Sequence, residues 1–344
     1  MLTPDDVPRI PLNTLAVPLG LAGLADLWSD SSHALGLPSG IGQTFWAIAA
    51  IGWLWMIAAH LRRGHRSTAS LASQLNHPVQ GPLASLVPIV GMAIAADLVD
   101  YWRIGGLVLG IASITASTIF AGWLISSWTT GRLELDSIHG GYFLPTVAAG
   151  YIAAFTAMQL GSRSVAVGAF VVATFFWVAL FILLIARLAF RPALPAPLLP
   201  TLAIIMAPPA VAARAWFAIA GPRANSVQEA LAALGVVMVL IELGILRRYL
   251  SLTFSLGFWS FTFPTAAVAG LAVAWLHLEH PAGWQVVAGA LVLGVTALVA
   301  AIGYRSVKAL RNTRPNPTSV ATVSAAETQL SQADDLVTAP ERRV

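Results

Sequence analysis

The sequence predicts an all-α integral membrane protein, and three observations support that fold class. Hydrophobic residues make up 57% of the 344 positions and charged residues only 10%, against about 45–50% and about 25% in average soluble domains. The apolar runs are each about 20 residues long, the length that a helix needs to cross a bilayer. Polar residues do not alternate with apolar ones inside these runs, which excludes a porin-like barrel. The composition also excludes a soluble enzyme.

Ten membrane helices are expected, arranged as five helical hairpins. The apolar runs lie at 12–28, 41–60, 81–99, 104–126, 140–160, 165–188, 198–219, 227–246, 256–276 and 283–304. Before them, residues 1–11 form a short segment with Asp5 and Asp6 and without the basic start of a cleaved signal, so the first run is expected to remain a membrane helix. Residues 12–307 form the transmembrane domain. Residues 308–344 are polar and aperiodic, which predicts a disordered cytoplasmic tail.

Proline distinguishes the odd-numbered runs from the even-numbered ones. Prolines well inside the odd runs are Pro18, Pro88, Pro145, Pro208, Pro209 and Pro264, and the even runs contain none. A proline removes one N–H donor and frees a carbonyl, which is tolerated in a membrane only beside protein or a watery cavity. The odd helices are therefore expected to be kinked and inner, and the even helices straight and outer. Because the prolines recur about every 60 residues, a helical hairpin is predicted to repeat, and five inner helices can surround a central pore.

The basic residues predict the orientation. The loops after the even runs and the end of the tenth run hold Arg62, Arg63, Arg66, Arg132, Arg187, Arg191, Arg247, Arg248, Arg305, Lys308, Arg311 and Arg314, whereas the opposite loops hold Arg103, Arg163 and Arg223. The positive-inside rule places both termini in the cytoplasm. The net charge of +4 does not indicate nucleic-acid binding, because the arginines lie singly or in pairs at run ends.

No catalytic or cofactor-binding pattern is present in the sequence. The chain has no cysteine, and its seven histidines lack the spacing of metal ligands. The motifs His-Glu-x-x-His, Gly-x-Ser-x-Gly and Asp-Asp-x-x-Asp do not occur. The sequence therefore predicts neither an enzyme nor a metal or cofactor site.

Five segments of the odd runs resemble one family of membrane proteins. They are PLNTLAVPLGLAGLA at 11–25, NHPV at 76–79, GYFLPT at 141–146, APPAV at 207–211 and FWSFTFP at 258–264. These segments resemble the tellurite-resistance/dicarboxylate transporter family, whose members include TehA and the plant slow anion channels. The resemblance covers the chain from about Pro8 to Arg305.

The resemblance implies a quasi-fivefold central pore within each subunit of a homotrimer in a plasma or bacterial inner membrane. It also implies that Phe263, which aligns with an occluding aromatic residue on the ninth helix, is a pore gate. The alternative is that Phe263 only packs between helices. The expected partners are small inorganic or organic anions and the lipid bilayer.

Hydroxyl groups near the prolines are candidate pore-lining donors, because weak attraction suits conduction better than tight binding. They belong to Thr14, Thr146, Ser260, Thr262 and Thr265. An equally weighted interpretation is that each hydroxyl bonds a carbonyl that a nearby proline frees, such as the Ser260 carbonyl freed by Pro264.

Arg214 is the one basic residue well inside a run, and two interpretations remain open for it. It either concentrates anions at an outer vestibule or pairs with Glu229. Asp26 and Asp97 are expected near helix ends, where water hydrates them, and Glu242 is expected near Arg247 and Arg248.

An anion channel is the function that these features favour. The alternative is a proton-coupled transporter of a C4-dicarboxylate, tellurite or a sulfite-like oxyanion, for which Asp97 and Glu242 are the candidate coupling residues.

Overall fold

The computed structural model describes residues 8–131, 133–221 and 223–312, and all regular secondary structure in them is helical. Nine helical segments in these ranges are long and apolar enough to cross a membrane. A further segment, Leu12–Leu35, is less apolar because its second half carries Asp26, Asp30 and His33.

Five of the long segments begin with a 3₁₀ or π turn and continue as an α-helix. The pairs are η1 (Leu12–Leu15) with α1 (Ala16–Leu35), η2 (Gly81–Ser85) with α4 (Leu86–Leu98), η4 and the π-helical η5 (Gly140–Phe143, Leu144–Ala148) with α6 (Ala149–Gln159), η6 (Ala196–Met206) with α8 (Ala207–Ala220), and η7 (Leu256–Phe261) with α10 (Thr262–Glu279). These segments correspond to the odd runs of the sequence.

The prolines mark the point where the α-helical part begins. Pro18, Pro88 and Pro264 each lie in the first turn of an α-helix, as do the paired prolines of α8, and Pro145 lies in η5. In a first turn the N–H that proline lacks has no partner four residues earlier, so its loss costs little. A proline kink was expected at these positions. The structure instead has a change there from 3₁₀ or π geometry to α-helical geometry.

The other five long helices are uninterrupted. They are α2 (Gly40–Gly64), α5 (Arg103–Thr129), α7 (Arg163–Phe190), α9 (Ser226–Leu250) and α11 (Trp284–Asn312). Exposed large apolar side chains are concentrated on these helices, for example Ile51, Ile111, Phe175, Leu240 and Leu293. Such a surface suits lipid, because lipid solvates apolar side chains that water does not. Two short helices, α3 (Leu71–Leu75) and η3 (Leu135–Ser137), lie in connections.

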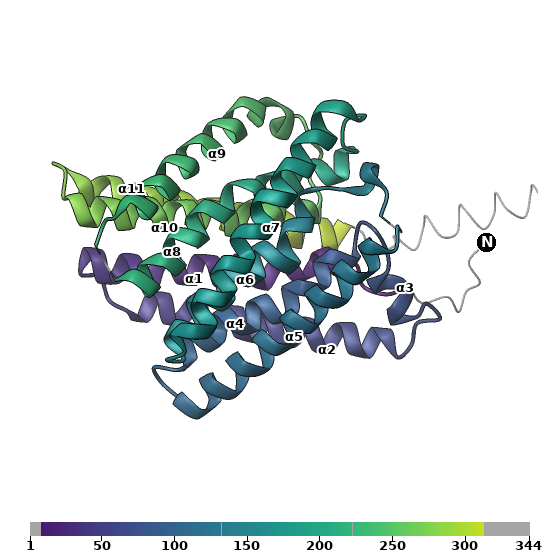
Figure 1. Ribbon diagram of the computed structural model, residues 1–344, viewed down its shortest axis with the longest axis horizontal. Coiled ribbons are helices and arrows are strands. Elements are labelled where there is room, and N and C mark those ends of the chain that lie inside the picture. The colour runs from purple at the N-terminus through teal and green to yellow at the C-terminus, as the bar shows by residue number, and fades with distance from the viewer. Residues whose placement is uncertain (1–7, 132, 222, 313–344) are drawn as a thin grey trace, which may run out of the picture. The chain divides into compact units, whose positions relative to one another are not determined.

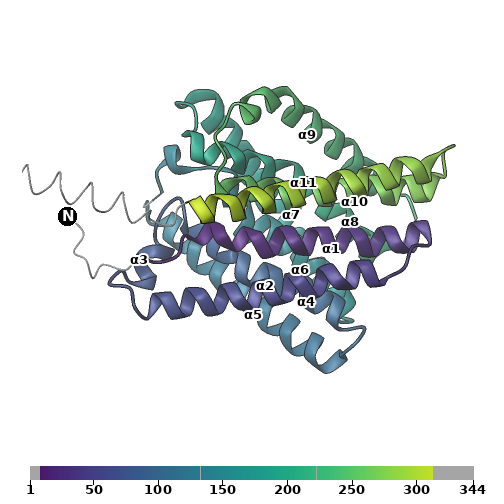
Figure 2. The ribbon, with the colours of Figure 1, turned by 180° about the vertical axis from the view of Figure 1, so that it is seen from behind.

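The proline-containing helices contact one another in a closed series. Helix α1 contacts α10 and α4, α4 contacts α6, α6 contacts α8, and α8 contacts α10. Figure 1 shows α6 among α4, α5, α7 and α8, and Figure 2 shows α1 with α2 on one side and α10 on the other. Helix α11 joins α1 through a hydrogen bond of 3.0 Å from Trp28 Nε1 to Thr296 Oγ1.

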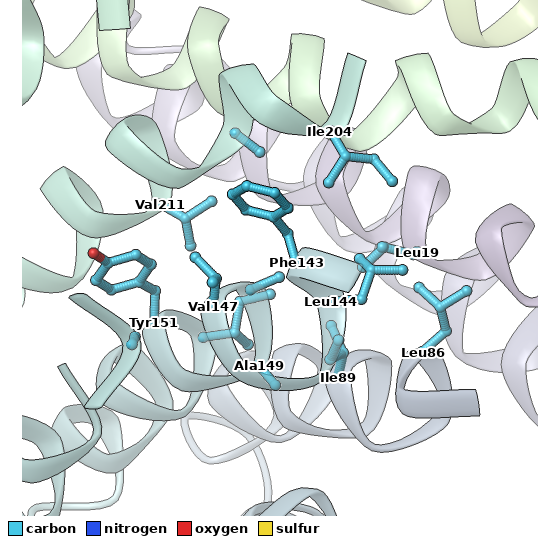
Figure 3. Packing of buried hydrophobic residues seen from close by; sticks show 14 of the residues in the cluster. Leu19, Leu86, Ile89, Phe143, Leu144, Val147, Ala149, Tyr151, Ile204 and Val211 are labelled. Carbon is cyan, nitrogen blue, oxygen red and sulfur yellow. The ribbon is translucent and has the colours of Figure 1, made fainter. Parts of the chain in front are cut away.

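A large buried apolar cluster fills the half of this series in which the proline-containing helices begin. Figure 3 shows part of it, and the labelled members are Leu19, Leu86, Ile89, Phe143, Leu144, Val147, Ala149, Tyr151, Ile204 and Val211. All of them are less than a tenth exposed. Since they come from α1, α4, η4, η5, α6, η6 and α8, this half of the bundle is closely packed.

The helix ends that lie farthest beyond the predicted ones are those of α1 and α11. Helix α1 continues to Leu35, well beyond position 28, and α11 continues to Asn312, beyond the predicted domain end at 307. Residues 301–344 separate from the rest as a second unit, of which the described part is the end of α11. Most of the predicted tail, from position 313 on, and the orienting residues Arg132 and Arg314 lie outside the described residues.

Candidate functional site

A cavity of about 580 Å³ lies among α1, α4, α6, α8 and α10 and is also lined by residues at the start of α2. Its lining runs toward the C-terminal end of each of the five helices, and on α10 it begins at Phe263, the second residue of that helix. The lining residues nearest the helix starts are Ala22, Ala93, Ile152, Ala210 and Phe263. The cavity therefore ends at the level of Phe263, next to the closely packed half of the bundle.

Phe263 lies where α10 approaches α1 most closely. A Cβ atom added to Gly23 would lie 2.9 Å from Cδ2 of the Phe263 ring, and one added to Gly20 would overlap the Thr262 hydroxyl. The two glycines thus allow α10 to approach the α1 backbone. The ring itself is partly buried, packs against the apolar cluster and contributes to the cavity wall.

Arg214 of α8 lies on the cavity wall and is held by two carboxylates of α1. Its Nη2 lies 2.6 Å from Asp26 Oδ1, and its Nη1 donates a hydrogen bond to Asp30 Oδ2. The guanidinium carbon also lies 4.3 Å from the ring centroid of Phe155, a cation–π contact. The structure gives Arg214 these partners in place of Glu229, the partner considered from the sequence.

Four aspartates line the cavity with this single arginine. Asp26 and Asp30 come from α1, and Asp97 and Asp100 lie at the end of α4. Asp26 was expected at a helix end, but it lies in the middle of α1 because that helix continues to Leu35. The sequence did carry a signal, because Asp26, Asp30 and His33 follow at intervals of four and three residues and so share one helix face.

None of the predicted lining hydroxyls is among the residues that line this cavity. Three of them bond nearby carbonyls: Thr14 with Pro11 at 2.7 Å, Thr262 with Trp259 at 2.7 Å and Thr265 with Phe261 at 2.6 Å. The carbonyls of Trp259 and Phe261 thus take the place expected for that of Ser260. Thr146 differs, because its buried Oγ1 has no hydrogen-bond partner among the described residues.

Glu242 lies on α9, away from the cavity lining. Its Oε2 accepts a hydrogen bond of 2.7 Å from the Tyr249 hydroxyl, while Arg247 and Arg248 are exposed. Its second oxygen is buried and has no hydrogen-bond partner among the described residues. Among those same residues there is no cluster of three or more His, Cys, Asp or Glu side chains suited to a metal ion.

Comparisons with known proteins agree with the sequence resemblance. The sequence model of the voltage-dependent anion channel family matches residues 9–307. The tellurite resistance protein TehA homolog of Haemophilus influenzae is 22% identical over 271 residues, which cover 78% of this chain and 82% of that protein. The S-type anion channel SLAH3 of Arabidopsis thaliana is 22% identical over 332 residues, which cover 91% of this chain and 51% of the plant protein. The chain therefore spans about half the length of the plant relative, and it belongs to the voltage-dependent anion channel family.

Proposed function

We propose that the protein is an anion channel whose path runs through the ring of α1, α4, α6, α8 and α10 and is closed by Phe263. In this proposal ten helices cross the membrane around a quasi-fivefold pore. Both termini are cytoplasmic, in a bacterial inner membrane. Three subunits assemble, each with its own pore. Small inorganic or organic anions are the permeant class.

The observation that carries the proposal is the cavity that ends at Phe263. The loops at its open end are the ones that hold few arginines, so the positive-inside rule makes the cavity an external vestibule. A phenylalanine ring at its floor offers an ion nothing in place of its hydration shell, so it blocks by size and dewetting.

Weak attraction for anions is available on the far side of the ring. The five inner segments begin on that side of the ring, each in a 3₁₀ or π turn, and the N-terminal end of a helix carries partial positive charge. The Thr146 hydroxyl, which has no hydrogen-bond partner within the part of the chain that the structure describes, lies at the π turn before α6 and can donate to a passing anion. These donors suit conduction, because they attract an anion without holding it.

The test is to record anion current from Phe263→Ala beside the wild-type protein in planar bilayers. The proposal expects a large rise in current when the ring is removed. The matched control is Phe261→Ala, which makes the same truncation at a ring that packs on Tyr249 and Phe258, outside the cavity. Equal current from wild type and Phe263→Ala, with both proteins folded, would show that Phe263 only packs between helices.

A second candidate function is proton-coupled transport of a C4-dicarboxylate, tellurite or a sulfite-like oxyanion. The observation in its favour is that Asp26 and Asp97 both line the cavity, where an ion path needs a titratable group if protons are to move with the anion. The two candidates differ in one measurable respect. A coupled carrier moves its reversal potential with the pH gradient, whereas a passive channel does not.

A further inference from the structure

Arg214 presents a planar, charged fork to the cavity in a fixed orientation. The Phe155 ring covers one face of the guanidinium, and the two terminal nitrogens each bond a carboxylate oxygen. A guanidinium carries five N–H donors, so these two bonds leave three for other acceptors. Because each carboxylate takes only one N–H, the remaining donors can still bind an oxyanion through a pair of N–H groups.

The two carboxylates occupy positions that the oxygens of a bound anion would take. The side chain of Asp30 is 41% exposed, against 31% for Asp26 and 28% for Arg214. Asp30 also lies one helical turn closer to the open end of the cavity than Asp26. Asp30 is therefore the more exchangeable partner, and Asp26 the one that anchors the guanidinium.

From this arrangement we infer that Arg214 is a docking site for oxyanions in the vestibule, with Asp30 as a built-in competitor for the same N–H groups. The inference deepens the proposed channel function, on which its consequence for current rests. A tethered carboxylate competes at high effective concentration, so Asp30 weakens the binding of a free anion to the N–H groups of Arg214. An oxyanion such as nitrate can accept from two N–H groups of the guanidinium at once, whereas chloride offers a single point of contact.

The groups around the site set its net charge. Besides Arg214, the acidic residues and histidines of the lining are Asp26, Asp30 and His33 of α1, Asp97 of α4, Asp100 just after that helix, and His277 of α10. Four carboxylates thus outnumber one guanidinium, so the lining is net negative while the histidines are neutral. Removing the charge of Asp30 takes one negative charge from a position next to the incoming anion. At about 5 Å in water this favours anion binding roughly fourfold, and more in a less polar surrounding.

The binding test follows the unfolding temperature of the purified protein in detergent while sodium nitrate replaces sodium chloride at constant ionic strength. Asp30→Asn is expected to lower the nitrate concentration for half-maximal stabilisation at least about fourfold. The double variant Asp30→Asn with Arg214→Gln is expected to lose nitrate stabilisation. Arg163→Gln, at the same end of the bundle but outside the cavity lining, is the control and is expected to behave as wild type.

A conservative variant separates the effect of the planar guanidinium of Arg214 from the effect of its charge. Arg214→Lys keeps the positive charge but loses the planar pair of N–H donors, so the ratio of nitrate to chloride permeability, recorded in the Phe263→Ala background that opens the path, is expected to fall toward one. If Arg214 only links α1 to α8, Arg214→Lys should change the stability of the protein without changing this permeability ratio.

The outcomes distinguish the inference from the channel proposal. Nitrate stabilisation that is unchanged by Asp30→Asn, or that persists without Arg214, would overturn the docking site. A nitrate-to-chloride ratio unchanged in Arg214→Lys would overturn it as well. Nitrate binding that depends on Asp30 and Arg214 as stated, with no current from wild type or Phe263→Ala, would support the docking site and reject the channel.

Discussion

His139 is buried in its neutral form between the loop before η2 and the start of η4, and acid is expected to destabilise the protein through it. Its Nε2 lies 3.1 Å from the Val79 carbonyl, and its Nδ1 accepts a hydrogen bond of 3.1 Å from the Gly141 N–H. Nε2 therefore carries the proton. A second proton would have to sit on Nδ1, which would remove the bond from Gly141.

The pKa of His139 gives the size of the effect. Burial lowers it from 6.5 to about 4, the bond to the Val79 carbonyl opposes this, and the charge of Arg187 lowers it further. Above pH 6.5 the folded and unfolded chains are both neutral at this position. Between pH 6.5 and about 4 only the unfolded chain takes up the proton, so stability falls. At about 1.4 kcal/mol for each pKa unit, the loss reaches about 3 kcal/mol.

The assay is the free energy of unfolding in detergent at pH values from 7.5 down to 4. His139→Asn is expected to be less stable than wild type at pH 7.5, because it loses a well-packed ring, but to lose less stability on acidification. The exposed His65, replaced by Gln, is the matched control and should keep the wild-type slope. Equal slopes for His139→Asn and wild type would refute the assignment of this pH dependence to His139.

Three further substitutions test the packing and charges that the structure describes. Gly23→Ala places a methyl group 2.9 Å from the Phe263 ring, so we expect it to lower the free energy of unfolding by about 1–3 kcal/mol. This loss should be smaller in a Phe263→Ala background, because the clashing ring is gone. Equal losses in the two backgrounds would contradict the contact. Arg214→Gln leaves two carboxylates without their cation and should reduce anion current mainly at low ionic strength, where charges are less screened; an equal reduction at high salt would contradict this. Glu242→Gln keeps an acceptor for the Tyr249 hydroxyl, so we expect a stability change under about 1 kcal/mol and unchanged current, and loss of pH-driven transport in this variant would favour the coupled carrier.

Much of the fold could be predicted because bilayer thickness and proline chemistry act locally along the chain. Apolar runs about 20 residues long fix where helices cross, and the structure has helices at each expected run. Proline separates the two classes of helix because a missing N–H is tolerated only in a protected place. The form of the irregularity was not predictable in this way, since a proline inside an apolar run fits a kink as well as a 3₁₀ start.

The charged wall of the cavity depends on contacts that a single sequence does not determine. Arg214 lies 188 residues from Asp26 and 184 from Asp30. The hydropathy falls at Trp28–His33, so the first expected run ends at position 28, just after Asp26 and before Asp30. Only the continuation of α1 to Leu35 brings both carboxylates to the level of Arg214.

The reversal potential of Phe263→Ala most directly tests the central claim, that an anion path runs between the five inner helices and is closed by the side chain of Phe263. The purified protein would be recorded in planar bilayers under an anion gradient, with and without a pH gradient, beside Phe261→Ala. The proposal expects a current much larger than that of wild type, with a reversal potential that follows the anion gradient and ignores pH. A potential that follows the pH gradient would contradict passive conduction, and a current no larger than that of wild type would contradict closure at Phe263.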